Sequence, residues 1–180
     1  MGERTVGSRR VFDGRLLRVD AVEVELDSGR RTVREIVRHP GAVAVLARLT
    51  DGRFVFVRQF RKAADRPLLE IVAGTLEPDE DPRACAAREL GEEAGCRADD
   101  LVAIGSIFPS PGYTDERIHL YYATVQPDPA GPAPDEDEEI DVVRLSEADV
   151  EARIGAGEIT DGKTLAAWLL YRKREMSGRG

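Results

Sequence analysis

The chain has 180 residues, of which 42% are hydrophobic and 33% are charged, so it can form one globular domain with a substantial core. Its formal net charge of −8 disfavours general nucleic-acid binding, which requires a basic face. The sequence contains no run of 18 apolar residues that would predict a membrane span, and residues 1–10 are polar and basic, unlike a secretory signal. We therefore expect a cytoplasmic protein without a membrane partner.

The first part of the chain is expected to be rich in β-strands. Residues 11–25 and 31–38 alternate between apolar and polar positions and should pair as an antiparallel hairpin. The apolar run 42–49 and residues 53–60 flank a turn at Thr50-Asp51-Gly52, which predicts the clearest hairpin of the chain. A short strand is expected around Leu68–Ile71.

The second part should combine helices with further strands. Residues 82–94 predict a helix, since Asp81 can cap its N-terminus, Pro82 suits its first position and Gly95 suits its C-terminal cap. The elements expected after it are strands at 100–107 and 117–125, a Pro-rich acidic surface loop at 127–139, a strand at 140–145, and helices at 146–154 and 161–174. This order predicts a mixed α/β layer fold.

Neither the cysteines nor the histidines predict a site of their own. If the segment between Cys85 and Cys96 is helical, the two thiols lie roughly 16 Å apart, beyond disulfide reach. We expect both to be buried as small apolar side chains. His39 and His119 are isolated in the sequence, which predicts neither a zinc site nor a histidine-based catalytic triad.

Three carboxylates should share one stripe of the helix at 82–94. Glu89, Glu92 and Glu93 have the spacing i, i+3, i+4, and Arg88 lies four residues before Glu92, within reach of an ion pair. Carboxylates this close repel one another, and a hard divalent cation such as Mg²⁺ would offset the repulsion. The alternative is an acidic helix face that is simply solvated.

The segment GTLEPDEDPRACAARELGEEAGC, residues 74–96, favours the metal site. It has the order Gly74, five residues, Glu80, seven residues, Arg88-Glu89-Leu90, one residue, Glu92-Glu93, one residue, Gly95-Cys96. This pattern resembles the complete Nudix box of the Nudix hydrolases, with Cys96 where the family usually has an aliphatic residue.

The resemblance implies a fold and a division of the chain. The fold is the Nudix α/β/α sandwich with a mixed sheet, preceded by a β-rich N-terminal arm. The expected parts are an arm at residues 1–40, a Nudix domain at 41–175 and a tail at 176–180. The arm suggests a homodimer, because family members often exchange N-terminal strands.

The same resemblance implies a bound cation. Mg²⁺, for which Mn²⁺ can substitute, would be held mainly by Glu89 and Glu93. Glu92 and the carbonyl of Ala73 would be further ligands, and Arg88 would orient the glutamates. The cation would neutralise phosphate charge and activate water for attack on phosphorus.

Segments outside the box resemble the ADP-ribose pyrophosphatases. They are FVFVRQFRKAADRPLLEIVAGTLE, SPGYTDERIHLYYA and GEITDGKTLAAWLLY, so the similarity extends over residues 31–172. Val72 stands where that group usually has proline. Pro111, sixteen residues after Gly95, occupies a position where enzymes that cleave ADP-ribose carry proline.

This narrower resemblance implies substrate contacts. Arg61 would bind phosphate, for which its planar guanidinium is suited, although Arg58 and Arg61 could equally be exposed charges at a strand end. Glu70 and Glu116 would contact the adenine or ribose region or assist the metal. Arg31 or Arg34 could reach the ligand of a neighbouring subunit.

The acidic run at 135–139 has two interpretations. It could be a solvated charge run, which is the commoner meaning of such a segment. Related enzymes instead take their general base from a loop at this position, and Glu138 or Glu139, just before Ile140, fits that role. Glu138 is slightly preferred.

The expected reaction is hydrolysis of ADP-ribose to AMP and ribose 5-phosphate. One alternative keeps the chemistry and changes the substrate to another nucleoside diphosphate sugar or a dinucleotide, such as GDP-mannose or NADH. Another is a non-catalytic nucleotide sensor, although the retained box glutamates disfavour it. A third, an acidic adaptor protein, explains none of the box.

Overall fold

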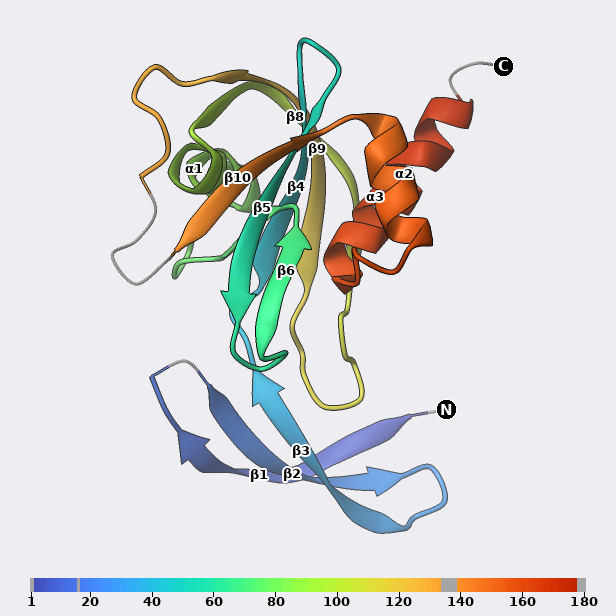
Figure 1. The fold of residues 1–180 in the computed structure, drawn as a ribbon. Coiled ribbons are helices and arrows are strands. Elements are labelled where there is room, and N and C mark those ends of the chain that lie inside the picture. Colours follow the sequence, from blue (N-terminus) through green and yellow to red (C-terminus); the bar gives the residue numbers. More distant parts are fainter. Residues whose placement is uncertain (1, 16, 134–138, 178–180) are drawn as a thin grey trace. The chain divides into compact units, whose positions relative to one another are not determined.

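The computed structural model describes residues 2–15, 17–133 and 139–177, and the chain divides into two compact units (Figure 1). The first unit comprises residues 1–41 together with 108–117. The second comprises residues 42–107 and 118–180. Within the described residues, no helix is both long enough and apolar enough to cross a membrane.

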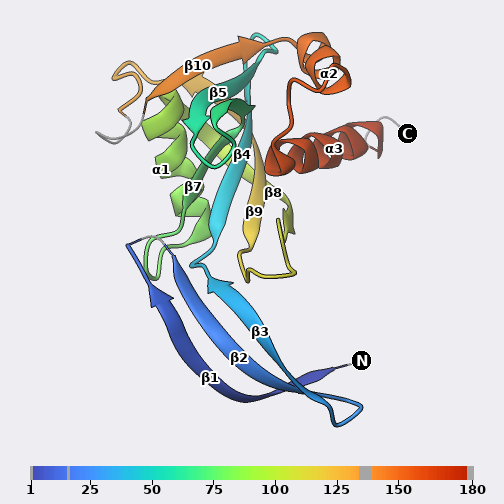
Figure 2. The ribbon, with the colours of Figure 1, turned by 60° about the horizontal axis from the view of Figure 1, so that its bottom comes forward.

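The first unit is built on a three-stranded antiparallel sheet with the order β1-β2-β3 (Figure 2). Its strands are β1 (Glu3–Asp13), β2 (Arg18–Leu26) and β3 (Arg31–Arg38). The expected strand at 11–25 is wrong, because the chain reverses between β1 and β2. Gly14 N–H donates to the carbonyl of Leu17 at 2.8 Å and closes that turn. The expected hairpin of β2 and β3 is confirmed.

The segment 108–117 belongs to this unit through contacts with β3. Val37 N–H donates to the carbonyl of Tyr113 at 2.8 Å, and Asp115 N–H donates to the carbonyl of Val37 at 3.2 Å. The Asp115 carboxylate accepts from His39 N–H and from the Arg38 guanidinium, both at 2.9 Å. A segment that is irregular in sequence is thereby fixed to a strand edge.

The second unit contains a mixed sheet with the order β10-β5-β4-β9-β8, while β6 pairs with β5 and β7 pairs with β4. The pairing of β4 with β9 is parallel and the other pairings are antiparallel. The strands are β4 (Ala42–Leu49), β5 (Phe54–Arg61), β6 (Arg66–Glu70), β7 (Val72–Thr75), β8 (Cys96–Ile107), β9 (Ile118–Pro127) and β10 (Ile140–Leu145).

Helices cover both faces of this sheet (Figure 1). Helix α1 (Pro82–Ala94) lies on one face, and α2 (Glu147–Gly155) and α3 (Gly162–Ser177) lie on the other. Strand β4 alternates between the two layers, since Val43 and Val45 pack in the core with α1 while Ala44 and Leu46 pack in the core with α3. The predicted α/β/α sandwich with a mixed sheet is confirmed.

The local signals for α1 are also confirmed. The Asp81 side chain accepts from the backbone N–H groups of Arg83 and Ala84, Pro82 begins the helix, and Gly95 ends it in the left-handed region with φ of 57°. In α3, Trp168 and Tyr171 are buried, whereas Leu169 is 59% exposed.

Candidate metal and phosphate site

The candidate site of the second unit is organised around residues 70–74, where the chain passes from β6 to β7. Glu70 ends β6, which is paired with β5, and Val72 begins β7, which is paired with β4. The two strands have different neighbours, so this short segment brings together groups from several elements.

Gly74 lies against the carboxylate of Glu89. A Cβ atom added to Gly74 would lie 1.9 Å from Cδ and Oε1 of Glu89, far closer than van der Waals contact permits. The side chain of Glu89 is largely buried. A side chain at position 74 would therefore displace the Glu89 carboxylate that α1 brings against the backbone of β7.

Glu93 contacts the neighbouring residue of the same strand. Its side chain lies one helical turn after Glu89 on the same side of α1, and the residue is 4% exposed. Its Oε2 atom accepts from Ala73 N–H at 3.1 Å. Two glutamates of α1 thus meet consecutive residues of β7.

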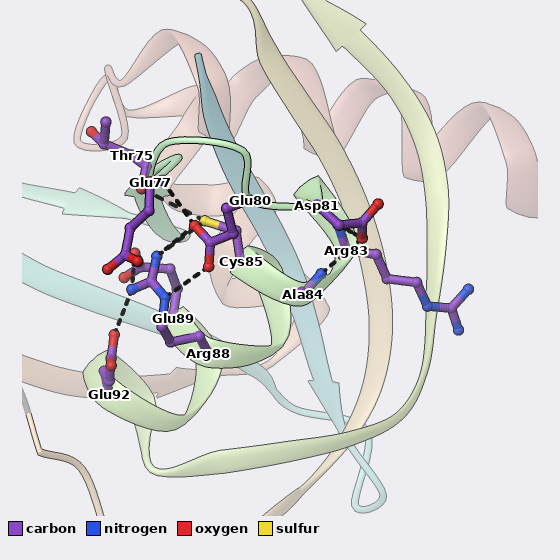
Figure 3. A network of polar contacts seen from close by, with 10 residues as sticks. All are labelled: Thr75, Glu77, Glu80, Asp81, Arg83, Ala84, Cys85, Arg88, Glu89 and Glu92. Carbon is purple, nitrogen blue, oxygen red and sulfur yellow. Dashed lines mark hydrogen bonds and ion pairs between the residues drawn. The ribbon is translucent and has the colours of Figure 1, made fainter. Parts of the chain in front are cut away.

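Arg88 binds three carboxylates, and we call Arg88, Glu80, Glu89 and Glu92 the Arg88 cluster (Figure 3). Its guanidinium donates to both oxygens of Glu80 at 3.0 and 3.1 Å, and to one oxygen each of Glu89 and Glu92 at 2.8 Å. Hydrogen bonding from Arg88 lowers the pKa of Glu80 to about 2, and the carboxylates raise the pKa of Arg88. The ion pair of Arg88 with Glu92 was predicted from their spacing and is confirmed.

Cys85 borders this cluster without being reactive. Burial raises the pKa of its thiol to about 12, and the hydrogen bond with Glu80 acts in the same direction. Cys85 and Cys96 are both buried and unlinked by a disulfide, as expected. A thiol with so high a pKa is protonated at neutral pH and is a poor nucleophile.

The donor set of this region fits a hard divalent cation. Glu80, Glu89, Glu92 and Glu93 provide only oxygen ligands, and a single guanidinium serves three of them. Among the described residues, however, no three acidic, histidine or cysteine side chains are arranged as a ready metal site. Glu89 and Glu92 each turn one carboxylate oxygen toward Arg88.

A second set of charges lies at residue 70, and we call Glu70, Arg61, Lys163 and Asp161 the Glu70 cluster. Glu70 is 1% exposed. Its carboxylate accepts two hydrogen bonds of 2.8 Å from Arg61 and a short one from Lys163 Nζ. Burial opposes ionisation of Glu70, but Arg61 and Lys163 outweigh it and lower the pKa of this carboxyl.

Sequence reasoning missed Lys163 and Asp161. Lys163 Nζ also donates to Asp161 Oδ1 at 3.1 Å, which places both residues beside Glu70. One signal in the sequence was available, since Asp161 lies three residues before Thr164 at a helix start, the spacing of an N-terminal cap. The position of Lys163 depends on how α3 docks, which the sequence does not reveal.

The remaining substrate candidates lie in the first unit. Arg31 is bonded to Glu25 at 3.2 Å and Arg34 to Glu3 at 2.6 Å, while Glu116 N–H donates to Thr114 Oγ1. The structure brings two candidates together, since Arg34 and Pro111 both line a pocket of about 430 Å³. The exposed rings of Phe108 and Tyr113, which sequence reasoning did not single out, line it as well.

Glu138 and Glu139 are the two candidate general bases. Glu138 lies outside the described residues. Glu139 is exposed and immediately precedes β10. The chain leading toward this region is fixed to the end of α1, because Ala133 N–H donates to the carbonyl of Glu92 at 2.9 Å.

Comparison with known proteins identifies the family to which this fold and this sequence belong. A solved structure titled as that of an ADP compounds hydrolase superposes with a TM-score of 0.85 over 100% of this chain and 97% of that one, at 24% identity, which supports the fold. The model of the NUDIX domain matches residues 37–166. The chain belongs to the Nudix family, and the family predicted from the box is confirmed.

Named relatives cover most of the chain. It is 41% identical to the methanol dehydrogenase activator of Bacillus methanolicus and 39% identical to the ADP-ribose pyrophosphatase of Bacillus subtilis, in each case over 92% of this chain and 90% of the relative. It is 34% identical to the GDP-mannose pyrophosphatase of Yersinia pestis over 79% of this chain and 77% of that protein.

Proposed function

We propose that this protein hydrolyses the pyrophosphate of ADP-ribose to AMP and ribose 5-phosphate with Mg²⁺, for which Mn²⁺ can substitute. The observation that carries the proposal is the packing of Glu89 and Glu93 against Gly74 and Ala73, in a chain that retains every glutamate of the box. The Bacillus subtilis relative named ADP-ribose pyrophosphatase supports this choice of substrate.

In this proposal Glu89 and Glu93 hold the cation, with Glu92 and the carbonyl of Ala73 as further ligands. When bound, the cation supplies charge neutralisation at the diphosphate and activation of water. Arg88 keeps the glutamates apart and oriented through its hydrogen bonds to Glu89 and Glu92.

Arg61 is the residue proposed to bind a substrate phosphate. Glu70 occupies its Nε–H and one Nη2–H, and the side chain is 39% exposed. An arginine has five N–H donors in a planar arrangement, so the remaining ones can bind phosphate oxygens. Glu70, which the sequence suggested as a substrate contact, receives hydrogen bonds from Arg61 and Lys163 in this structure and remains a proposed contact.

Glu138 or Glu139 is proposed to take the proton of the attacking water. Glu139 is exposed in a segment directly before β10, from which a carboxylate can approach a bound substrate. Arg31 or Arg34, Pro111 and Glu116 complete the proposed substrate contacts. A homodimer and a cytoplasmic location belong to the same proposal, and light scattering of the purified protein tests the dimer.

A second candidate substrate is GDP-mannose, which the name of the Yersinia pestis relative favours. NADH and other nucleoside diphosphate derivatives share the bond to be cleaved. A nucleotide sensor without turnover is the candidate of a different class, and retention of Glu89, Glu92 and Glu93 argues against it.

The experiment that tests the proposal measures AMP release from ADP-ribose with Mg²⁺, beside GDP-mannose and NADH. Glu93→Gln should lower kcat by at least about 100-fold, roughly 2.7 kcal/mol of barrier, since the amide keeps the shape and loses the charge. Glu158→Gln, on the surface after α2, is the matched control and should retain wild-type turnover. Glu138→Gln or Glu139→Gln should cost at least about tenfold if that residue is the base.

Each outcome leads to a different conclusion. Turnover of GDP-mannose or NADH instead of ADP-ribose would keep the metal site and change the substrate. If both Glu138→Gln and Glu139→Gln retain wild-type turnover, neither residue is the general base. Tight binding of ADP-ribose with no hydrolysis in Mg²⁺ or Mn²⁺ would favour the sensor.

A further inference from the structure

The N-terminus of α3 fixes the backbone at the centre of the site. Ile71 N–H donates to Thr164 Oγ1 at 3.0 Å, and Thr164 Oγ1 donates to Asp161 Oδ2 at 2.6 Å. Ile71 and Thr164 are both completely buried. Because Ile71 lies between Glu70 and the Ala73–Gly74 pair, this contact ties α3 to the segment that meets the box glutamates.

Lys163 adds a charged contact beside this backbone anchor. Its ammonium bonds Oε2 of Glu70, the atom that also accepts from Nη2 of Arg61. The same ammonium also donates to Asp161 Oδ1 at 3.1 Å. Glu70 is thereby fixed by a cation from β5 and by a cation from α3.

The charges of the Glu70 cluster balance only when Lys163 is present. Two carboxylates, Glu70 and Asp161, face two cations, Arg61 and Lys163. Glu70 chiefly, and Glu93 and Asp161 to a smaller extent, raise the pKa of Arg61, so Arg61 senses all three carboxylates. Without Lys163, Arg61 would be the one cation left in the cluster for Glu70 and Asp161, and breaking a buried ion pair leaves an uncompensated charge. The Glu70 carboxylate would then lose one of its two cations and be held less firmly, so the guanidinium of Arg61 would lose its fixed orientation toward an incoming phosphate.

We propose that Lys163 is a positioning residue that, through Glu70, holds the guanidinium of Arg61 in the orientation that binds a phosphate of the substrate. The identity of the substrate rests on the proposed function. The orientation of Arg61 is a property of the folded chain and can be measured without substrate.

The first test follows the Nε–H of Arg61 by ¹⁵N NMR, with the resonance assigned by its loss in Arg61→Lys. This proton is hydrogen-bonded to Glu70 and should exchange slowly with water. Lys163→Met should accelerate its exchange at least about tenfold, about 1.4 kcal/mol of protection. Lys163→Arg should stay within about threefold of wild type, and so should Lys173→Met on the exposed side of the same helix.

Unchanged exchange in folded Lys163→Met would overturn the proposal. If Lys163→Met does not fold, Lys163→Gln, which removes the charge and keeps a donor, is judged by the same criterion.

The second test is a double-mutant cycle on ADP-ribose hydrolysis. Lys163→Met and Arg61→Met should each raise KM at least about tenfold and leave kcat within about threefold, the pattern of lost uniform binding. Because both act through one guanidinium, the double variant should be no more than about threefold worse than Arg61→Met.

Effects that multiply to about 100-fold, or a fall in kcat at unchanged KM, would overturn the proposal, because Lys163 would then act independently of Arg61. A wild-type enzyme that does not hydrolyse ADP-ribose would contradict the proposed function instead. In that case the exchange measurement alone decides the role of Lys163.

Discussion

The Arg88 cluster and the Glu70 cluster both join carboxylates to cations, but carboxylates outnumber the cation in the first and the two kinds are equal in number in the second. In the Arg88 cluster one guanidinium serves three carboxylates, and the side chain of Glu92 is 43% exposed. In the Glu70 cluster one completely buried carboxylate receives two cations. The first therefore has unbalanced negative charge facing solvent, whereas the second directs a partly exposed guanidinium outward.

This difference indicates which ligand each cluster suits. Surplus carboxylate oxygen attracts a hard cation, and an arginine fixed on one edge offers its other edge to phosphate. The two clusters are joined by residues 70–74, with Glu70 at one end and Gly74 against Glu89 at the other. Binding a pyrophosphate with its cation uses both carboxylates and a guanidinium, and residues 70–74 connect the two clusters that supply them.

The largest effect on the contrast between the two clusters is expected from a substitution at Gly74. Gly74→Ala should lower kcat/KM for ADP-ribose at least about tenfold, roughly 1.4 kcal/mol, because its Cβ would displace the Glu89 carboxylate. The matched control is Gly91→Ala in α1, where a Cβ meets no atom within 4 Å. It should keep wild-type activity and raise stability by about 0.5–1 kcal/mol, since alanine favours helix.

Steady-state kinetics and thermal melts of the two variants check this expectation. Full activity in Gly74→Ala would show that the contact of Glu89 with Gly74 is not needed for the chemistry.

A smaller effect is expected where α3 anchors the other end of the segment. Thr164→Val keeps the shape of the side chain but leaves the buried Ile71 N–H without its acceptor. Urea denaturation should show a loss of about 1–3 kcal/mol in the free energy of unfolding. Thr164→Ser retains the hydroxyl and should lose less; equal losses in the two variants would assign the effect to packing rather than to the hydrogen bond.

The smallest expected effect is a pH dependence arising in the Arg88 cluster. The pKa of Glu80 is about 2 in the folded chain against an ordinary value of 4.5, so its ionised form is favoured by folding. This stabilisation is fully present above about pH 4.5 and is lost as the pH falls toward 2. The stability difference between wild type and Glu80→Gln should therefore be constant from pH 7 to 5 and shrink between pH 4.5 and 3.

Urea denaturation at pH 7, 5 and 3 measures that difference. The same difference at pH 7 and pH 3 would show that Arg88 does not hold Glu80 ionised.

Local chemistry explains which parts of the fold were predictable. Helix α1 was predicted to the residue, because Asp81, Pro82 and Gly95 act through the neighbouring backbone. The break between β1 and β2 was missed because loose alternation continues on both sides of Gly14, although Asp13-Gly14 is a turn signal. The parallel pairing of β4 with β9 joins segments far apart in sequence, and no local pattern encodes it.

The site divides in the same way. Glu89, Glu92, Glu93 and Arg88 were found because helical spacing puts them on one stripe. Lys163 meets Glu70 across 93 residues, through the docking of α3, so spacing along the chain carries no information about it. Arg61 likewise reaches Glu70 although the two are not partners in the register of β5 with β6, in which Glu70 lies opposite Val57.

The docking of α3 also has a consequence for how the protein folds. We expect contacts that span 93 residues to form after local ones, because closing so long a loop costs entropy before any contact repays it. On the ribosome, residues 42–127 are synthesised before Gly162, so strands β4 to β9 and α1 can form while Glu70 still lacks its second cation. The single tryptophan of the chain, Trp168, is buried in this last helix against Phe54. The change in its fluorescence during refolding should therefore report the docking of α3, the step that brings Lys163 to Glu70.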